Sequence, residues 1–149
     1  MLSWRQTCSD FAVTGLGCQA LLALPLTAFF ASRQYPGSAI RAAMDWALEQ
    51  ARTRQIVISG FHSPLEQSML HLLLEARSPV VAVLARPIAE ARLKPEWTIA
   101  IAEQRMAVVS ASTVAQRLTS ERAALRNELV AQLADHIVIA HASANGALI

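Results

Sequence analysis

Apolar residues follow two alternating patterns from about residue 26 onward. Five short runs of consecutive apolar residues, several rich in β-branched side chains, have the length of strands buried on both faces. They occupy residues 26–31, 55–60, 79–85, 106–110 and 136–141. Between the runs, apolar residues return every three or four positions, which predicts amphipathic helices. The predicted helices are residues 38–52, 64–76, 95–103 and 113–134.

This alternation determines the expected fold class. Strands that are apolar on both faces and joined by helices form a parallel sheet covered on two sides. We therefore predict a three-layer α/β/α fold with a Rossmann-like, doubly wound, mostly parallel sheet of about five strands. A length of 149 residues suits one domain. We assign residues 26–149 to this domain, with residues 88–94 as a polar connector.

The first 25 residues are predicted to form a helical lead-in to the domain. Residues 11–32 contain no charged side chain, a stretch long enough to consider a signal peptide or a membrane-spanning helix. Gly15, Gly17 and Pro25 interrupt it, and Pro25 would break a helix near its middle. We therefore favour a chain with no membrane segment and keep a membrane helix as the alternative.

Composition narrows the class of protein further. A content of 54% hydrophobic and 16% charged residues excludes general disorder. The net charge of +2 neither requires nor excludes a polyanionic partner, but all basic residues except Lys94 are arginine, which suits bidentate phosphate contacts. Cys8 and Cys18 make no disulfide framework, so we expect a reduced, cytoplasmic protein. No cysteine and histidine spacing typical of a metal site is present.

Candidate chemistry is concentrated where predicted strands end, because ligands of such folds bind outside the carboxyl ends of the strands. Neither a GxGxxG nor a GxxxxGK[ST] motif occurs, so we expect no cofactor of the usual dinucleotide kind. After the first strand, Arg33 would either bind a phosphate or carboxylate or lie solvated at the surface, and spacing favours neither. The turns concerned are residues 32–34, 59–66, 86–87 and 142–146.

The turn before the second helix contains a capping box. Ser63 accepts from the backbone of the first helical turn, and Glu66 reaches back to the backbone N–H of Ser63. Pro64 occupies the first helical position, where its missing N–H costs nothing. This structural role accounts for the motif. The alternative is an anion at the helix N-terminus beside His62, although Glu66 would repel a phosphate and would instead accept from a ribose hydroxyl or a base edge.

The histidines carry little information by themselves. His71 lies within a predicted helix and His136 begins a strand, positions that favour structural or solvated roles. His141 ends the last strand and is the better candidate for a cleft. No Ser/His/Asp order or pair of carboxylates suggests a catalytic site. On the long fourth helix, Arg122 and its charged neighbours are predicted to form a salt-bridged face.

Taken in order, these segments resemble the DNA-processing protein A (DprA/Smf) family, which lies within a wider Rossmann-like group that includes the LOG proteins. Residues 21–25 with Ser32 and Arg33 resemble the family's lead-in and Gly-Ser-Arg turn, with Ala31 in the place of glycine. Residues 57–60 are similar to its second-strand motif. The next six residues replace the family's glycine-rich turn.

The strongest likeness is on the fourth helix and after the last strand. Residues 126–135 look like the family's Arg-Asn-x-x-x-Ala-x-Leu helix, and residues 145–148 resemble its closing Ser-Gly-Ser-Leu turn. Further segments are similar to a divergent branch of the family, namely residues 61–64, 85–87, 91–93 and 95–97. The resemblance runs from about residue 17 to 148. The family's final helix, strand and winged-helix module are expected to be missing.

Members of this bacterial family bind single-stranded DNA and load recombinase during natural transformation. The resemblance therefore implies a non-catalytic, DprA-like domain that binds single-stranded DNA or nucleotide phosphates at the carboxyl edge of the sheet, in DNA uptake and processing. From the apolar composition we also expect a homo-oligomer, namely a homodimer. The implied ligand-binding residues are Ser32, Arg33, Ser59, Gly60, His62, Ser63, Arg86, Arg92, Arg126, Asn127, Asn145 and Gly146.

Two other functions stay open at this point. The first is a LOG-type enzyme that cleaves the N-glycosidic bond of a nucleoside monophosphate, with Glu66 as its acid/base candidate. The Pro-Gly-Gly-x-Gly-Thr turn of those enzymes is missing from the sequence. The second is a structural or dimerising member of the family that binds no ligand.

Overall fold

The five predicted strands lie in one sheet in a computed structural model, which describes residues 2–31, 37–112 and 119–140. All five run parallel, with β7 beside β3 at one end and β6 at the other. Each strand starts and ends within two residues of its predicted bounds. These strands are β3 (Leu26–Ala31), β4 (Ile56–Ser59), β5 (Val80–Val83), β6 (Met106–Ser110) and β7 (His136–Ala140).

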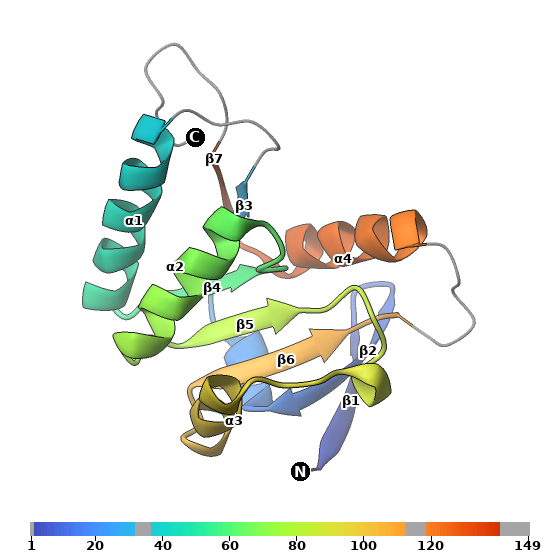
Figure 1. Cartoon of the computed structure of the whole chain (residues 1–149). Helices are drawn as coiled ribbons and strands as arrows, with labels where there is room; N and C mark the ends of the chain where they lie inside the picture. The colour runs from blue at the N-terminus through green and yellow to red at the C-terminus, as the bar shows by residue number, and fades with distance from the viewer. Residues whose placement is uncertain (1, 32–36, 113–118, 141–149) are drawn as a thin grey trace.

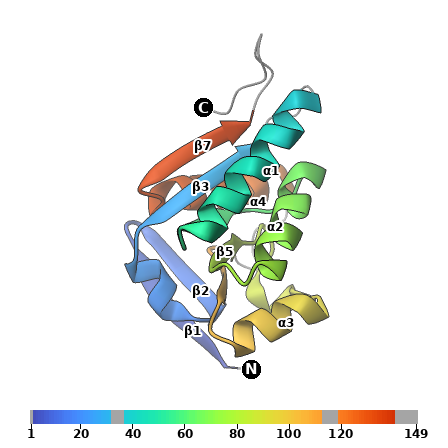
Figure 2. The same cartoon turned by 90° about the vertical axis from the view of Figure 1, so that its left-hand side faces the viewer.

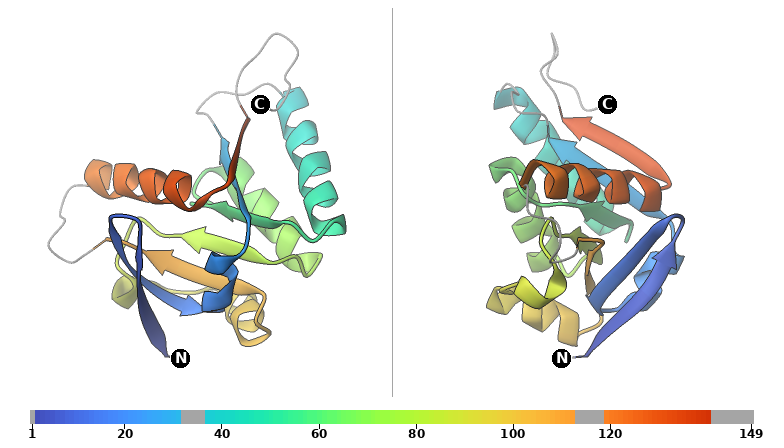
Figure 3. Two further views of the ribbon diagram at one scale, coloured as in Figure 1. Left: turned by 180° about the vertical axis from the view of Figure 1, so that it is seen from behind. Right: turned by 90° about the vertical axis from the view of Figure 1, so that its right-hand side faces the viewer.

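Helices cover both faces of this sheet, so the predicted three-layer α/β/α fold is confirmed (Figure 1). One layer contains α1 (Gly37–Arg52), α2 (Pro64–Glu75) and α3 (Pro95–Ala102), which lie side by side in Figure 2. The other contains α4 (Thr119–Leu133) and the 3-10 helix η1 (Gln19–Ala23), seen from behind in Figure 3. A second 3-10 helix, η2 (Ile88–Glu90), begins the polar connector.

The N-terminal segment differs from its prediction. Instead of a helical lead-in, it forms β1 (Ser3–Cys8) and β2 (Phe11–Gly17), an antiparallel hairpin that pairs with β6. The order of the seven-stranded sheet is β1-β2-β6-β5-β4-β3-β7, so the expectation of about five strands was too low. The proposed division of the chain at residue 25 stays a prediction.

Local packing explains why this glycine-containing segment is a hairpin. The Trp4 ring lies across Gly15, its partner on β2, so closely that a side chain on Gly15 would collide with it. The indole Nε1 of Trp4 donates to the carbonyl of Gly17 at 3.0 Å. Gly17 itself has a φ of +88°, which favours glycine. Gly15 and Gly17, which interrupt the apolar pattern in the sequence, are therefore the residues that permit the hairpin.

Two apolar layers hold the fold together. Phe29 and Met106 on the sheet pack with Met69 of α2 on one face. Ile58 and Leu129 pack together on the other face, which α4 covers. Each fully buried side chain of this size stabilises the fold by roughly 1.5–3 kcal/mol. Within the described ranges, the structure contains no helix that is both long and apolar enough to span a bilayer.

Candidate functional site

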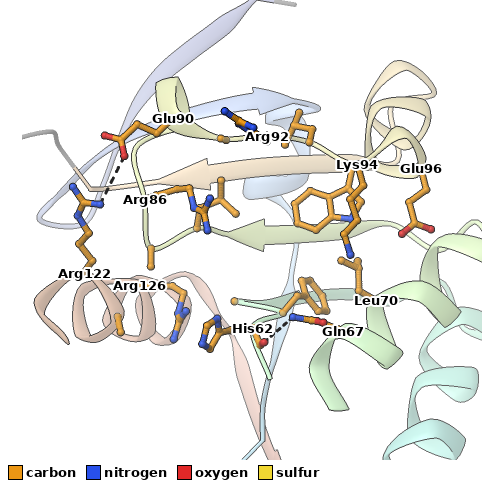
Figure 4. Close-up of a pocket in the computed structure, with 18 of the residues that line it drawn as sticks. His62, Gln67, Leu70, Arg86, Glu90, Arg92, Lys94, Glu96, Arg122 and Arg126 are labelled. Carbon is orange, nitrogen blue, oxygen red and sulfur yellow. Dashed lines mark hydrogen bonds and ion pairs between the residues drawn. The ribbon is translucent and has the colours of Figure 1, made fainter. Parts of the chain in front are cut away.

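A cavity of about 770 Å³ opens at the carboxyl edge of the sheet, beside the start of α2 (Figure 4). The turn after β4, the connector after β5, and helices α2, α3 and α4 form its walls. Among the described residues, two carboxylates line it, those of Glu90 and Glu96. Five basic side chains of the same residues do, which leaves an excess of three positive charges (five minus two). The five are Arg86, Arg92, Lys94, Arg122 and Arg126.

The Arg126 side chain reaches this cavity through the space that Gly60 leaves open. A Cβ atom at Gly60 would lie 2.7 Å from Cδ and 2.8 Å from Nε of Arg126, so the contact requires a residue without a side chain. Partial burial lowers the pKa of the Arg126 guanidinium, and the Glu66 carboxylate opposes this shift. Figure 4 shows the guanidinium beside His62. A half-buried guanidinium among other basic side chains is well suited to hold an anion.

Arg86 is positioned through its backbone. The buried hydroxyl of Ser110, at the end of β6, donates to the Arg86 carbonyl at 2.8 Å and accepts from the Ser112 N–H at 3.0 Å. The turn after β5 is therefore fixed to the end of the neighbouring strand. The Arg86 side chain is exposed and lies in the cavity between the connector and α4 (Figure 4).

Arg122 joins two walls of the cavity. Its Nη1 lies 3.8 Å from Oε1 of Glu90, which belongs to η2 on the opposite side. The sequence had placed this arginine only on a salt-bridged helix face and so missed its place in the site. A usable signal exists, because Arg122 precedes Arg126 by four residues and must share its side of the helix.

The end of the cavity near α3 is more apolar. Phe61 is buried, Trp97 is half-buried, and both line the cavity together with Leu70. At its rim, the ring nitrogens of His71 lie 3.1 Å from Oε1 of Glu75 and 3.3 Å from Oε2 of Glu96. This aromatic lining could not be predicted from the sequence, because Phe61 and Trp97 are distant in the chain and share no motif.

Glu66 has a structural role that the capping box predicted. One carboxylate oxygen accepts from the backbone N–H groups of His62 at 2.8 Å and Ser63 at 3.4 Å, and the other from that of Ala31 at 2.9 Å. The Glu66 N–H donates in turn to Ser63 Oγ. The side chain therefore takes the position that an anion would occupy at this helix end. It is buried and does not line the cavity, which argues against an acid/base role.

The predicted site residues fall into three groups. Those that line the cavity are Gly60, His62, Arg86, Arg92 and Arg126. Three others support it: Ser59 Oγ accepts from the Phe61 N–H, Ser63 caps α2, and the exposed Asn127 accepts from Arg126 Nε at 3.2 Å. The remaining four lie outside the described residues, as does His141. They are Ser32, Arg33, Asn145 and Gly146.

Comparisons with known proteins agree with this architecture. A family model described as DNA recombination-mediator protein A matches residues 11–149. The solved structure of DNA processing protein A from Streptococcus pneumoniae is similar, with a TM-score of 0.69 and 15% identity. That match covers 91% of this chain, which spans about half (48%) of the other. No curated protein matches the chain.

A second similar structure is that of DNA processing protein A from Helicobacter pylori, reported for its single-stranded DNA binding mode. The TM-score is 0.72 at 16% identity, and the match covers 96% of this chain and 70% of that one. Identities this low show a shared fold, whereas the family model covers most of the sequence.

Proposed function

The chain belongs to the DNA recombination-mediator protein A family, and we propose that it binds single-stranded DNA in the cavity at the carboxyl edge of its sheet, without covalent chemistry. One observation carries this proposal: basic side chains from α4 and from the connector after β5 converge on a single cavity. Among them, Arg126 packs closely against Gly60. The structure of the H. pylori family protein, reported for its single-stranded DNA binding mode, supports the choice of ligand.

The two ends of the cavity suit the two parts of a single strand. Arginine guanidinium groups make strong, often bidentate bonds to phosphate oxygens, so Arg86, Arg122 and Arg126 would contact the backbone. Trp97 offers apolar surface to an unpaired base, and base–aromatic stacking contributes about 1–3 kcal/mol per base. A duplex keeps its bases stacked inside, so this combination favours a single strand.

A salt series tests the proposal. We expect an oligothymidylate to bind with an affinity that falls as salt rises, with a log–log slope of about −0.7 for each phosphate neutralised. Replacing Arg86 and Arg126 together by glutamine should reduce the steepness of that slope by about 1.4, or 0.7 for each lost contact. Arg41→Gln removes an exposed charge on α1 and is the matched control. An affinity independent of salt, or equal losses in the control, would contradict the proposal.

The enzymatic alternative is not favoured, since Glu66 is occupied by three backbone N–H groups and no other carboxylate was a candidate. We expect no free base after incubation of the protein with adenosine monophosphate. A thermal shift series compares the other ligands, because a bound ligand must stabilise the folded state. Stabilisation by oligonucleotides beyond that by mononucleotides is expected, and no shift with either would favour a member that binds nothing.

We further propose a cytoplasmic location, a homodimer and a role in DNA uptake. The family description supports a role in recombination. Sedimentation velocity of the purified chain tests the homodimer directly, with a dimer expected. A species that stays monomeric at every protein concentration would contradict that part alone.

A further inference from the structure

A second groove lies at the same edge of the sheet, between the β1–β2 hairpin and the end of β6. Its volume is about 530 Å³. The groove exists because β2 pairs with β6 only from Thr14 to Gly17, so the first residues of β2 extend past the end of that ladder. The polar side chains relevant to its chemistry are those of Arg5, Thr7, Thr14, Ser110 and Ser112.

Strand register connects this groove to the first cavity. Arg5 on β1 is paired with Thr14 on β2, and Thr14 is paired with Ser110 on β6. Paired residues point to the same face of a sheet, so the three form a row across three strands. Two strand spacings, or about 10 Å, separate Arg5 from Ser110. Ser110 donates to the carbonyl of Arg86, which places the end of the row against the wall of the first cavity.

The chemistry of the groove favours an anion. Among the described residues that line it, none is acidic. Arg5 is exposed, and within the described part of the chain its side chain makes no hydrogen bond or ion pair. Thr7 and Thr14 add hydroxyl groups, which donate to phosphate or sugar oxygens.

We propose that this groove is a second subsite for the same single strand, in which Arg5 contacts a backbone phosphate of the DNA that leaves the first cavity past Arg86. The inference rests on the proposed function and extends its footprint from one cavity to a path across β5, β6, β2 and β1. The strand would run from the Arg86 turn past the end of β6, where Ser110 is buried, and over Thr14 to Arg5.

Oligonucleotide length separates the two sites. Arg5→Gln and the control Arg41→Gln are compared for binding of oligothymidylates of about 4 and about 12 nucleotides, across a salt series. For the long oligonucleotide, Arg5→Gln should lower the affinity and make the salt slope shallower by about 0.7, the value for one lost phosphate contact. For the short one, which the first cavity accommodates, Arg5→Gln should behave like wild type.

The outcomes distinguish this inference from the proposal beneath it. If the wild type binds neither oligonucleotide, the proposed function fails and the second subsite with it. If the wild type binds both but Arg5→Gln matches Arg41→Gln on the long one, the first site stands and the second is wrong. Equal losses of affinity for the short and the long oligonucleotide would also overturn the second subsite, because Arg5 would then affect binding of DNA that does not reach the groove.

Discussion

At the scale of single residues, the site depends on a glycine and a glutamate as much as on its cations. Gly60 makes room for the Arg126 side chain. Glu66 holds the backbone N–H groups of His62 and Ser63 in the turn before α2, and that of Ala31 at the end of β3. Neither residue needs to touch the ligand. We therefore expect a substitution at Gly60 to act mainly on ligand binding and one at Glu66 to act mainly on stability.

Gly60→Ala should weaken binding while leaving the fold intact. The added methyl group would displace the flexible end of Arg126, whereas the φ of Gly60 lies in a region open to alanine. A charge-assisted hydrogen bond contributes about 1.5–3 kcal/mol, so oligonucleotide affinity should fall roughly tenfold or more. Fluorescence anisotropy measures this, with Gly37→Ala as control because nothing lies within 4 Å of a Cβ there. Equal affinities for the two variants would contradict the role of the contact.

Glu66→Gln should act mainly on stability. In wild type, the N–H groups of His62 and Ala31 donate to different oxygens of the Glu66 carboxylate. A glutamine amide has only one acceptor oxygen, so one of these N–H groups would face the amide NH2, which is itself a donor. A buried donor without a partner costs about 1–3 kcal/mol, which urea unfolding would detect as a lower free energy of unfolding. The exposed Glu128→Gln on α4 is the comparison. Unchanged stability in Glu66→Gln would mean that the capping box does not support the turn.

At the scale of elements, tight turns with positive φ connect each of three helices to the strand that follows it. Arg54, Arg77 and Gln104 have φ values near +60°, and each lies just after a helix and just before the next strand. Glu103 joins two of these turns through Arg105 and Arg77. The hairpin depends instead on Gly17, which ends β2.

Gly17→Ala should destabilise the hairpin. Its φ of +88° is strained for alanine, and the new Cβ would collide with the backbone carbonyl of Met106, which cannot rotate away. Strain of this kind costs about 1–3 kcal/mol even without the collision. Urea unfolding should therefore show a loss at least that large. A value within about 0.5 kcal/mol of wild type would show that the connection relaxes freely.

Glu103 gives a prediction about acid stability. Its hydrogen bond with Arg105 lowers the pKa of the carboxyl below the ordinary value of 4.5, with Arg77 adding to the effect. Because the pKa of Glu103 is lower in the folded state, its contribution to the free energy of unfolding is complete above about pH 4.5. This contribution is lost as the pH falls through the lower pKa of the folded state. The difference in urea midpoint between wild type and Glu103→Gln should therefore shrink toward acid pH. A difference that stays constant with pH would contradict this linkage.

At the scale of the whole molecule, the sequence predicted the parallel part of the fold well. Runs such as residues 106–110 are apolar on both faces because they are central in the sheet, so their pattern is purely local. The hairpin was missed because its key contact, Trp4 over Gly15, depends on strand pairing. Its glycines resembled breaks in a helix when seen in sequence alone.

The site was predicted in part, for the same reason. Turn residues such as His62 and Arg86 follow from the position of strand ends, a rule that sequence can apply. Trp97 and Lys94 belong to the cavity only because the connector packs η2 against β2 and β6 and then runs back along β6 to α3 (Figure 1). That path depends on the Ser110 bond to the Arg86 carbonyl and on packing of η2, neither of which has a sequence signal.

The most direct test of binding in this cavity is a titration of the isotopically labelled protein with a short oligothymidylate, followed by amide chemical shifts. The largest changes are expected at Gly60, His62, Arg86 and Arg126, in proportion to the bound fraction, while α1 stays unaffected. Changes that gather on α1 or on the far edge at β7, with the cavity amides unmoved, would contradict the assignment of the cavity as the binding site.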